Sequence, residues 1–306
     1  MMMKNKKILA FAVLAAAGVQ PMFACDFCSV YSAQQAEGAG KGFFAGGAEQ
    51  FTSFGSLLND NNPESANGEY IDSSIFQAFA GYNFNRWVGV QLNVPVIYRV
   101  YGSPMRSGSD FGLGDISLVG NFVLFQRSTD NFTFRWTALA GMKFPTGNSS
   151  WLGRDDFAPG IGGHDLALGS GSFDGLFGTG FFTRWKKLFF TGQMQYAVRS
   201  QGDYQHQYAN DWSWAGGPGV YLALEDNYTV ALQFAVSGES KGKDTFAGVP
   251  DNDSAETIIY AGPQIDFTWS ENFGAHIGAD LPVSIDETGE QLVPDYRIHA
   301  AMTWRF

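Results

Sequence analysis

The sequence lacks any long hydrophobic run, any excess of basic residues and any internal linker. Its longest apolar run, residues 8–19, has about a dozen residues, whereas a helix that crosses a bilayer needs ~20, so a helical membrane span is excluded. A net charge of -11 argues against nucleic acid as a partner, because phosphate binding requires a basic surface. No change in composition and no Pro- or Ser-rich stretch divides the chain, so we expect one domain.

Residues 1–24 have the pattern of a cleaved signal peptide. Lys4, Lys6 and Lys7 form a basic segment, the apolar run follows, and Pro21 and Ala24 precede the expected cleavage site. We therefore expect the protein to be exported, and any membrane crossing to be made by strands.

Aromatic residues make up 16% of the chain and 38 residues are glycine, yet the mean hydropathy is close to neutral. A soluble secreted enzyme seldom combines these properties. They are typical of a transmembrane β-barrel, in which lipid-facing apolar residues alternate with lumen-facing polar ones and aromatic girdles mark both membrane interfaces.

The last eleven residues, 296–306, alternate between apolar and mostly polar side chains, which predicts a strand with one apolar face. The strand ends on an aromatic residue, Phe306. A soluble edge strand can alternate in the same way, but this ending is similar to the C-terminal signature that the outer-membrane assembly machinery reads in β-barrel proteins. The apolar positions are Tyr296, Ile298, Ala300, Met302, Trp304 and Phe306.

The same period of two recurs along the chain and predicts twelve strands, an even number as in bacterial single-chain barrels. We expect them at 41–53, 71–83, 87–101, 114–126, 131–144, 171–185, 188–200, 212–225, 228–239, 257–269, 272–285 and 295–306.

The connections between these strands alternate strictly in length. Those after even-numbered strands are short, and those after odd-numbered strands are long and polar, at 54–70, 102–113, 145–170, 201–211, 240–256 and 286–294. Periplasmic turns and extracellular loops produce this alternation, whereas a soluble β-sandwich does not. The predicted fold is thus all-β: an antiparallel up-and-down transmembrane barrel of about twelve strands over residues 41–306, in the outer membrane of a Gram-negative cell.

Acidic residues are concentrated in the long connections. They favour a solvated, repelling surface in contact with lipopolysaccharide; the alternative is divalent-cation bridging to lipopolysaccharide, or weak Ca²⁺ binding at 251–253. These residues are Asp60, Glu64, Glu69, Asp155, Asp156, Asp165, Asp251, Asp253, Glu256, Asp286, Glu287 and Glu290.

Three glycine-containing phrases in the middle of the chain carry a family resemblance. They are Gly-Leu-Gly-Asp-Ile-Ser-Leu at 112–118, Gly-Met-Lys-Phe-Pro-Thr-Gly at 141–147 and Leu-Ala-Leu-Gly-Ser-Gly-Ser-Phe-Asp at 166–174. In order and spacing they resemble the outer-membrane family named for the meta-pathway of phenol degradation. The resemblance implies a barrel that passes small, often aromatic, molecules, without indicating which one.

Physically, we interpret these phrases as structural elements of the loop mouth rather than as a binding site. Gly112 and Gly114 permit a tight turn, Pro145 ends the hydrogen-bond ladder, and Gly169 and Gly171 allow backbones to approach closely.

Cys25 and Cys28, the only cysteines, follow the expected cleavage site within a periplasmic segment, 25–40, that is long enough to fold into the lumen as a plug. In an oxidising periplasm we favour a local disulfide. A copper or zinc site and a lipid anchor on Cys25 are alternatives. Haem attachment is rejected because Ser29, not histidine, follows the pair. No cofactor is expected apart from the metal alternative.

The side chains between the lipid-facing ones should line the lumen. The positive side of a constriction is expected from Arg99, Arg135, Arg199 and Arg297. His276 and His299, on adjacent strands, are interpreted as hydrogen-bonded wall residues. The predicted pore-lining residues are Arg99, Asp115, Arg135, Lys143, Arg199, Asp266, His276, Asp280, Arg297 and His299.

The predicted function is a channel or facilitated transporter that lets small solutes, including small aromatic or hydrophobic ones, flow down their gradient. One alternative is a structural barrel, or one that binds metal through Cys25 and Cys28. The alternative from another class is an outer-membrane hydrolase, which is disfavoured because no serine and histidine pair at strand spacing. We therefore predict no enzyme activity.

Overall fold

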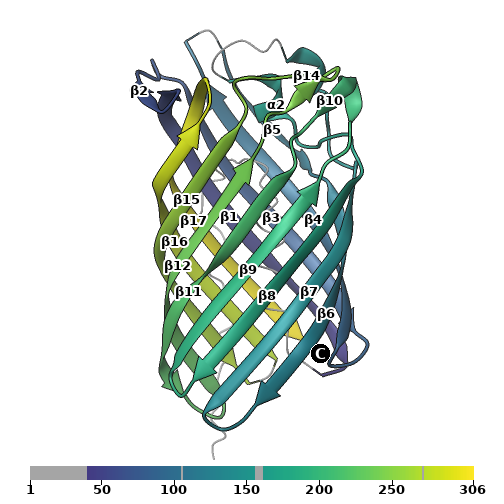
Figure 1. The fold of residues 1–306 in the computed structure, drawn as a ribbon, viewed down its shortest axis with the longest axis vertical. Helices are drawn as coiled ribbons and strands as arrows, with labels where there is room; N and C mark the ends of the chain where they lie inside the picture. Colours follow the sequence, from purple (N-terminus) through teal and green to yellow (C-terminus); the bar gives the residue numbers. More distant parts are fainter. Residues whose placement is uncertain (1–39, 105, 156–160, 271) are drawn as a thin grey trace, which may run out of the picture.

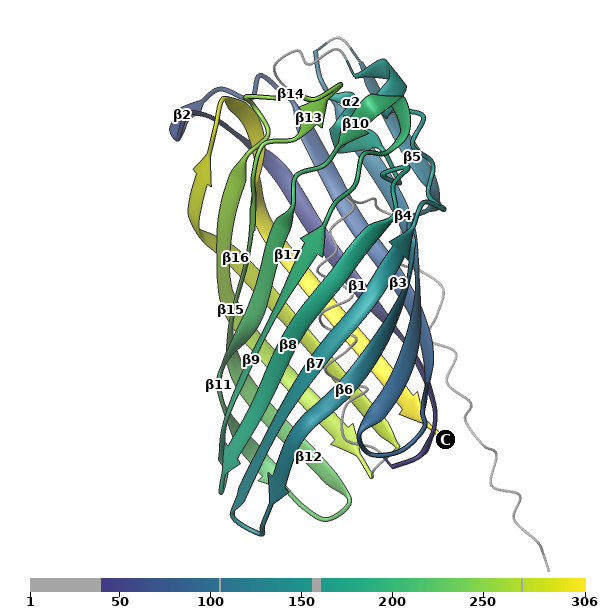
Figure 2. The same cartoon turned by 45° about the vertical axis from the view of Figure 1, so that its right-hand side comes forward.

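The computed structural model describes residues 40–104, 106–155, 161–270 and 272–306. Twelve long antiparallel strands follow one another around a closed barrel (Figures 1 and 2), as predicted. The strands are β1 (Gly42–Asn59), β3 (Tyr70–Asn83), β4 (Val88–Gly102), β6 (Ile116–Ser128), β7 (Phe132–Phe144), β8 (Asp174–Trp185), β9 (Leu188–Val198), β11 (Asp211–Leu224), β12 (Tyr228–Lys241), β15 (Glu256–Trp269), β16 (Phe273–Glu287) and β17 (Glu290–Arg305).

The first and last strands close the barrel. β1 pairs with β17 from Phe44 opposite Arg305 to Asn59 opposite Glu290, and the terminal Phe306 N–H donates to the Phe43 carbonyl at 2.8 Å. Closure removes the two free edges that an open sheet would expose, so the facing backbone groups of β1 and β17 are paired within the wall.

The period of two sorts side chains between lipid and lumen. Trp136 and Leu232 lie exposed on the outer face, whereas their neighbours Thr137 and Gln233 are buried inside the barrel. The exposed outer positions of the other strands are likewise mostly aromatic or aliphatic. This apolar outer surface around a closed barrel is what a lipid environment requires.

At one end of the barrel, the connections that the structure describes are short turns, at 84–87, 129–131, 186–187 and 225–227, and β15 and β16 are also joined there by a short connection, as predicted. We call it the periplasmic end; the C-terminal residue also lies there (Figure 1). Lys186 and Ser270 adopt positive φ angles of 54° and 53°, a backbone conformation that the tight turns of β-hairpins require.

At the opposite, outer end, the prediction of six long loops is wrong for three of them. β1 extends to Asn59, turns at 60–61 and continues as β2 (Asn62–Glu64); β5 (Ser107–Leu113) fills most of 102–113; and β16 joins β17 through a turn at 288–289. Glycine and polar residues interrupt the alternation there and suggested loops, but the backbone pairing of these segments continues. The connections 145–173, 199–210 and 242–255 remain long.

These three long connections contain only short elements, gathered at the outer end in Figure 2. None of the helices in the described part of the chain is long and apolar enough to cross a membrane. The elements are η1 (Leu152–Arg154), α2 (Gly163–Leu166), η2 (Asp203–Gln205) and a small sheet of β10 (His206–Gln207), β13 (Thr245–Phe246) and β14 (Val249–Pro250).

The hydrogen-bond ladder between β16 and β17 covers only the periplasmic part of these strands, as far as the structure describes them. Their pairing runs from Phe273 opposite Trp304 to Asp280 opposite Arg297. Beyond that point, in the part of the chain that the structure describes, β16 pairs only with β15 and β17 pairs only with β1. Pro282 and Pro294 lie in the separated halves, where a missing N–H removes a ladder donor. The two strands therefore part just beyond the Asp280–Arg297 contact.

Candidate functional site: a cavity beneath the outer loops

The outer half of the lumen contains a cavity of about 280 Å³. Apolar residues of β1, β3, β4 and β17 and of the connection 145–173 line it, together with polar and charged groups from these and the other strands. The apolar residues, which we call the apolar wall, include Phe54, Ile71, Ile75, Ile97, Leu168 and Leu292.

The connection 145–173 folds into the barrel mouth and forms the roof of this cavity; we call its described residues, 145–155 and 161–173, the inner loop. Leu168 is 2% exposed and packs against Ile75 and Ile97 on the inner wall. Leu166 packs in the same way against Ile71 and Tyr101. Burial of these side chains, worth roughly 1.5–3 kcal/mol for each leucine, holds the loop inward.

Arg99 fixes the inner loop from the β4 side. Its guanidinium, 2% exposed, donates to the carbonyls of Asp165 at 2.5 Å and Ala167 at 2.8 Å. These carbonyls are at the end of α2, so the buried cation satisfies acceptors that the short helix leaves open.

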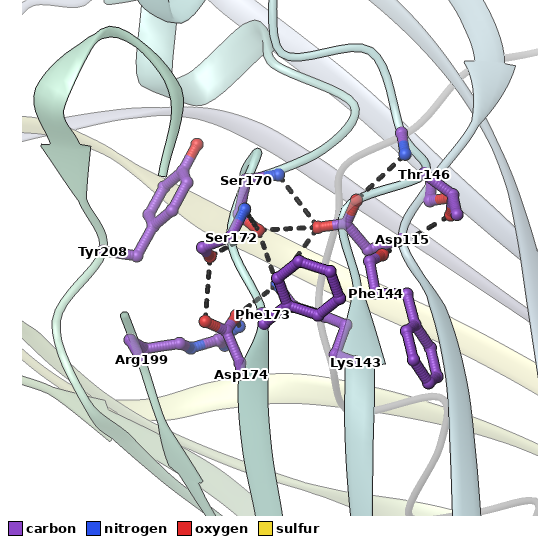
Figure 3. A network of polar contacts seen from close by, with 12 residues as sticks. Asp115, Lys143, Phe144, Thr146, Ser170, Ser172, Phe173, Asp174, Arg199 and Tyr208 are labelled. Carbon is purple, nitrogen blue, oxygen red and sulfur yellow. Dashed lines mark hydrogen bonds and ion pairs between the residues drawn. The ribbon is translucent and has the colours of Figure 1, made fainter. Parts of the chain in front are cut away.

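Asp115, between β5 and β6, fixes both ends of the same loop (Figure 3). One carboxylate oxygen accepts the Gly147 N–H at 2.9 Å; the other accepts the Ser170 N–H at 2.9 Å and the Ser170 hydroxyl at 2.7 Å. Because Gly147 begins the loop and Ser170 ends it, a single buried carboxylate sets where the loop leaves and rejoins the wall.

Alternating charges extend from Asp115 along the inner wall, as Figure 3 shows. Lys143 lies 3.2 Å from Asp115 and 2.7 Å from Asp174, and Arg199 lies 3.0 Å from Asp174 and also contacts Asp211. Buried charges are stable only when paired. We therefore interpret this row of ion pairs as a structural feature that stiffens the wall, in which Lys143 and Arg199 are not free cations.

The three glycine-containing phrases converge here. A Cβ on Gly147 would lie 2.6 Å from the Leu168 carbonyl oxygen and 3.0 Å from a Gly114 backbone carbon, and one on Gly169 would lie 2.6 Å from Gly147 backbone atoms. The predicted close backbone approach at Gly169 is confirmed. Each phrase also contributes a polar group: Asp115 from the first, Lys143 from the second and Ser170 from the third.

A second polar cluster lies where β16 and β17 part. Arg297 contacts Asp280 at 2.9 Å, bonds Ser237, and stacks its guanidinium 3.9 Å from the Tyr260 ring centre. His299 lies 3.4 Å from the same Asp280 carboxylate. All the charges of this cluster are thus held by neighbours.

The two lumen histidines lie side by side, as their positions on adjacent strands predicted. Their ring centres are 5.6 Å apart in an edge-to-face arrangement. Among the described residues, no group of three or more His, Cys, Asp or Glu side chains could hold a metal ion, which leaves the Ca²⁺ alternative at 251–253 without support. Cys25 and Cys28 lie outside the described residues.

Above the cavity, His164 of α2 is held by two carboxylates. Asp155 accepts from its backbone N–H at 2.8 Å and contacts Nδ1 at 2.6 Å, and Asp165 lies 3.5 Å from Nε2. Burial opposes protonation, but Asp165 and Asp155 outweigh it and raise the pKa of His164 to about 9. His164 is therefore a cation at neutral pH.

His206, from the connection between β9 and β11, stacks on His164 with ring centres 6.3 Å apart. It is 1% exposed, and neither ring nitrogen has a hydrogen-bond partner among the described residues. Burial lowers the pKa of His206; Asp244 and Asp155 oppose that shift, and His164 and Lys241 add to it.

The cavity gathers half of the residues predicted to line a pore. Arg99, Asp115, Lys143, Arg199 and Arg297 border it. The other predicted residues face the lumen elsewhere: Asp280, His299 and His276 join the second cluster, Asp266 accepts from Gln264 at 2.7 Å, and Arg135 lies near the periplasmic end of β7.

Of the four arginines predicted to form the positive side of a constriction, three border the cavity and Arg135 does not. Sequence reasoning missed Ser170 as a partner of Lys143, and Asp174 and Asp211 as partners of Arg199. The first two belong to the phrase at 166–174, so that phrase was the available signal.

No known protein-family model matches the sequence, and no curated protein matches it. Solved structures do. The COG4313 outer membrane channel from Pseudomonas putida F1 aligns with a TM-score of 0.66 and 13% identity over 89% of this chain and 97% of that chain.

Two autotransporter barrels align more loosely. The β domain of Bordetella BrkA has a TM-score of 0.49 and 10% identity over 88% of this chain and all (100%) of that chain. The NalP translocator domain from Neisseria meningitidis has 0.46 and 11%, over 91% and 92%. Among these three structures, the channel is the one whose similarity supports the fold, a closed antiparallel β-barrel.

Replacing Asp115 with Asn should release the inner loop. A hydrogen bond to a charged group contributes roughly 1.5–3 kcal/mol, so we expect protease cleavage within 145–173, measured from outside on the membrane-embedded protein, to accelerate more than about tenfold. Asp130→Asn, in an exposed periplasmic turn, is the matched control. Equal cleavage of the two variants would show that Asp115 does not hold the loop.

The docking of the inner loop should depend on pH in two ways. His164, whose pKa is raised from 6.5 to about 9, contributes stability that is complete below pH 6.5, declines above it and is gone above about 9. His206, whose pKa is lowered, contributes stability that is present above 6.5 and is lost as the pH falls through its folded value.

Protection of the inner loop from protease should therefore be greatest near pH 6.5. His164→Gln should remove the alkaline decline and keep the acid one, and His206→Gln should do the reverse. An alkaline decline that persists unchanged in His164→Gln would refute this assignment.

Proposed function

We propose that the protein is an outer-membrane channel through which small solutes, including small aromatic or hydrophobic molecules, diffuse down their gradient. The observation that carries this proposal is the cavity of about 280 Å³ inside the closed barrel, whose lining combines apolar side chains with polar and charged groups. An engineered cavity of ~150 Å³ holds benzene, so a single substituted ring fits this one.

The likeness to the COG4313 outer membrane channel supports this proposal, because that barrel matches this chain over nearly its whole length. The three phrases support a finer one: membership of the family named for the meta-pathway of phenol degradation. Their contacts around Asp115 give the phrases a shared physical purpose, since together they dock the inner loop.

In this proposal the inner loop is the gate of the channel. A solute coming from outside must pass the loops 145–173, 199–210 and 242–255 before it reaches the cavity. The anchoring contacts of Arg99 and Asp115 hold the first of these inward, so their strength would set how often the mouth admits a solute. We assign no catalytic step to any residue.

Single-channel recording in planar bilayers tests the proposal. Purified protein should conduct, and Arg99→Ala should raise the mean conductance severalfold, because the inner loop loses two anchoring hydrogen bonds. Arg127→Ala, at an exposed position near the periplasmic end, should conduct like the wild type. A barrel that inserts and never conducts, with or without Arg99, would favour a structural role.

We also propose that the segment 25–40 folds into the lumen from the periplasmic side as a plug that narrows the path without closing it, with Cys25 and Cys28 joined as a disulfide. A membrane-impermeant maleimide tests both statements. Intact cells should show no labelling even after reduction, whereas reduced cells with a permeabilised outer membrane should label both cysteines. Labelling in intact cells would exclude the plug.

Labelling of permeabilised cells without a reductant, after addition of a chelator, would favour the metal alternative over the disulfide. A lipid attached to Cys25 would appear as added mass in the intact protein.

A further inference from the structure

Among the residues that the structure describes, eight acidic and five basic side chains line the cavity beneath the inner loop. Each of the basic groups is held by protein acceptors, as described above for Arg99, Lys143, Arg199 and Arg297. The fifth, Lys241, lies 3.5 Å from Glu256. His164, which also borders the cavity, is held between Asp155 and Asp165. The lining therefore offers no uncommitted cation to an anionic solute.

By contrast, three of the acids have no basic partner in the part of the chain that the structure describes. Asp251, Asp253 and Glu290 have no basic side chain within ion-pair distance among the described residues, and all three are half-buried at the cavity margin. The repulsion between Glu290 and Glu69 adds to burial in raising the pKa of Glu69. A confined space with surplus negative charge concentrates cations and repels anions.

Two uncharged groups in the wall are also without partners. Gln50 is 5% exposed and Ser213 is 4% exposed, and neither Gln50 Oε1 nor Ser213 Oγ has a hydrogen-bond partner among the described residues. Both side chains border the cavity, from β1 and β11, which are nearly opposite in the order of strands around the barrel. Buried acceptors of this kind require a donor, and a solute in the cavity can supply one.

We propose that this cavity binds small organic cations, in which an ammonium group is carried on a single aromatic ring or a short aliphatic body. The unneutralised acids attract the charge, Gln50 Oε1 and Ser213 Oγ accept its N–H groups, and the wall around Ile75, Ile97 and Leu168 receives the apolar body. Anions of the same size are excluded. The inference deepens the proposed channel function by naming the class of solute that the outer site selects.

The test uses the purified full-length protein in planar bilayers, with benzylammonium chloride and sodium benzenesulfonate as ring-sized probes of opposite charge. In a KCl gradient the zero-current potential should have the sign of cation selectivity. Benzylammonium should block the potassium current at concentrations where benzenesulfonate has no effect. Block by both probes alike, or anion selectivity, would overturn the inference while leaving the channel function intact.

Two sets of variants separate the roles of the residues. Ser213→Ala and Gln50→Leu should each raise the half-blocking concentration of benzylammonium about tenfold and leave the zero-current potential unchanged. The triple variant Asp251→Asn, Asp253→Asn, Glu290→Gln should move that potential toward zero. The control, Glu225→Gln with Asp226→Asn in the periplasmic turn, should change neither; equal effects of control and triple variant would contradict the assignment.

A second measurement distinguishes failure of the channel function from failure of the cation site. If no preparation conducts, isothermal titration of the protein in detergent with benzylammonium still decides the question. Binding that is weakened in Ser213→Ala would support the site without a channel, and no binding to the wild type would overturn it.

Discussion

Pairing of β1 with β17 is the interaction on which the rest of the structure depends. In lipid, an unpaired backbone N–H or carbonyl costs several kcal/mol, so a sheet of this size is stable there only when its two edges meet. The pairing extends along both strands and shifts register only around Ser53, Phe54 and Ser56. Once the ring is closed, the period of two leaves each side chain one of two environments, lipid or lumen.

The lumen environment explains the charge arrangement. Side chains that point inward from twelve strands share a narrow space, so Asp115, Lys143, Asp174 and Arg199 are paired across neighbouring strands. Asp115 also accepts hydrogen bonds from the inner loop, so one of the paired charges of the wall holds the roof of the cavity in place. Around the cavity, the acids without a basic partner among the described residues are Asp251, Asp253 and Glu290, which lie at its margin.

Much of the fold could be predicted from the sequence because period two is a local signal: residues such as Trp136 and Thr137 reveal their faces without any knowledge of their neighbours. The same alternation predicted that Arg99, Lys143 and Arg297 point inward, and all three are buried inside the barrel. It could not show that 54–59 and 107–113 are strands, because glycine and polar residues interrupt the alternation there. Nor could it pair Asp115 with Ser170, which is 55 positions away.

The central claim is that the closed barrel holds, under the inner loop, a cavity that accepts a small solute against an apolar wall. Crystals of the protein soaked with 4-bromobenzyl alcohol test it most directly, because the anomalous scattering of bromine locates the ring without ambiguity. The account predicts a bromine peak inside the barrel, beside Ile97, Leu168 and Leu292. Bromine found only on the lipid-facing surface, with none in the lumen, would contradict it.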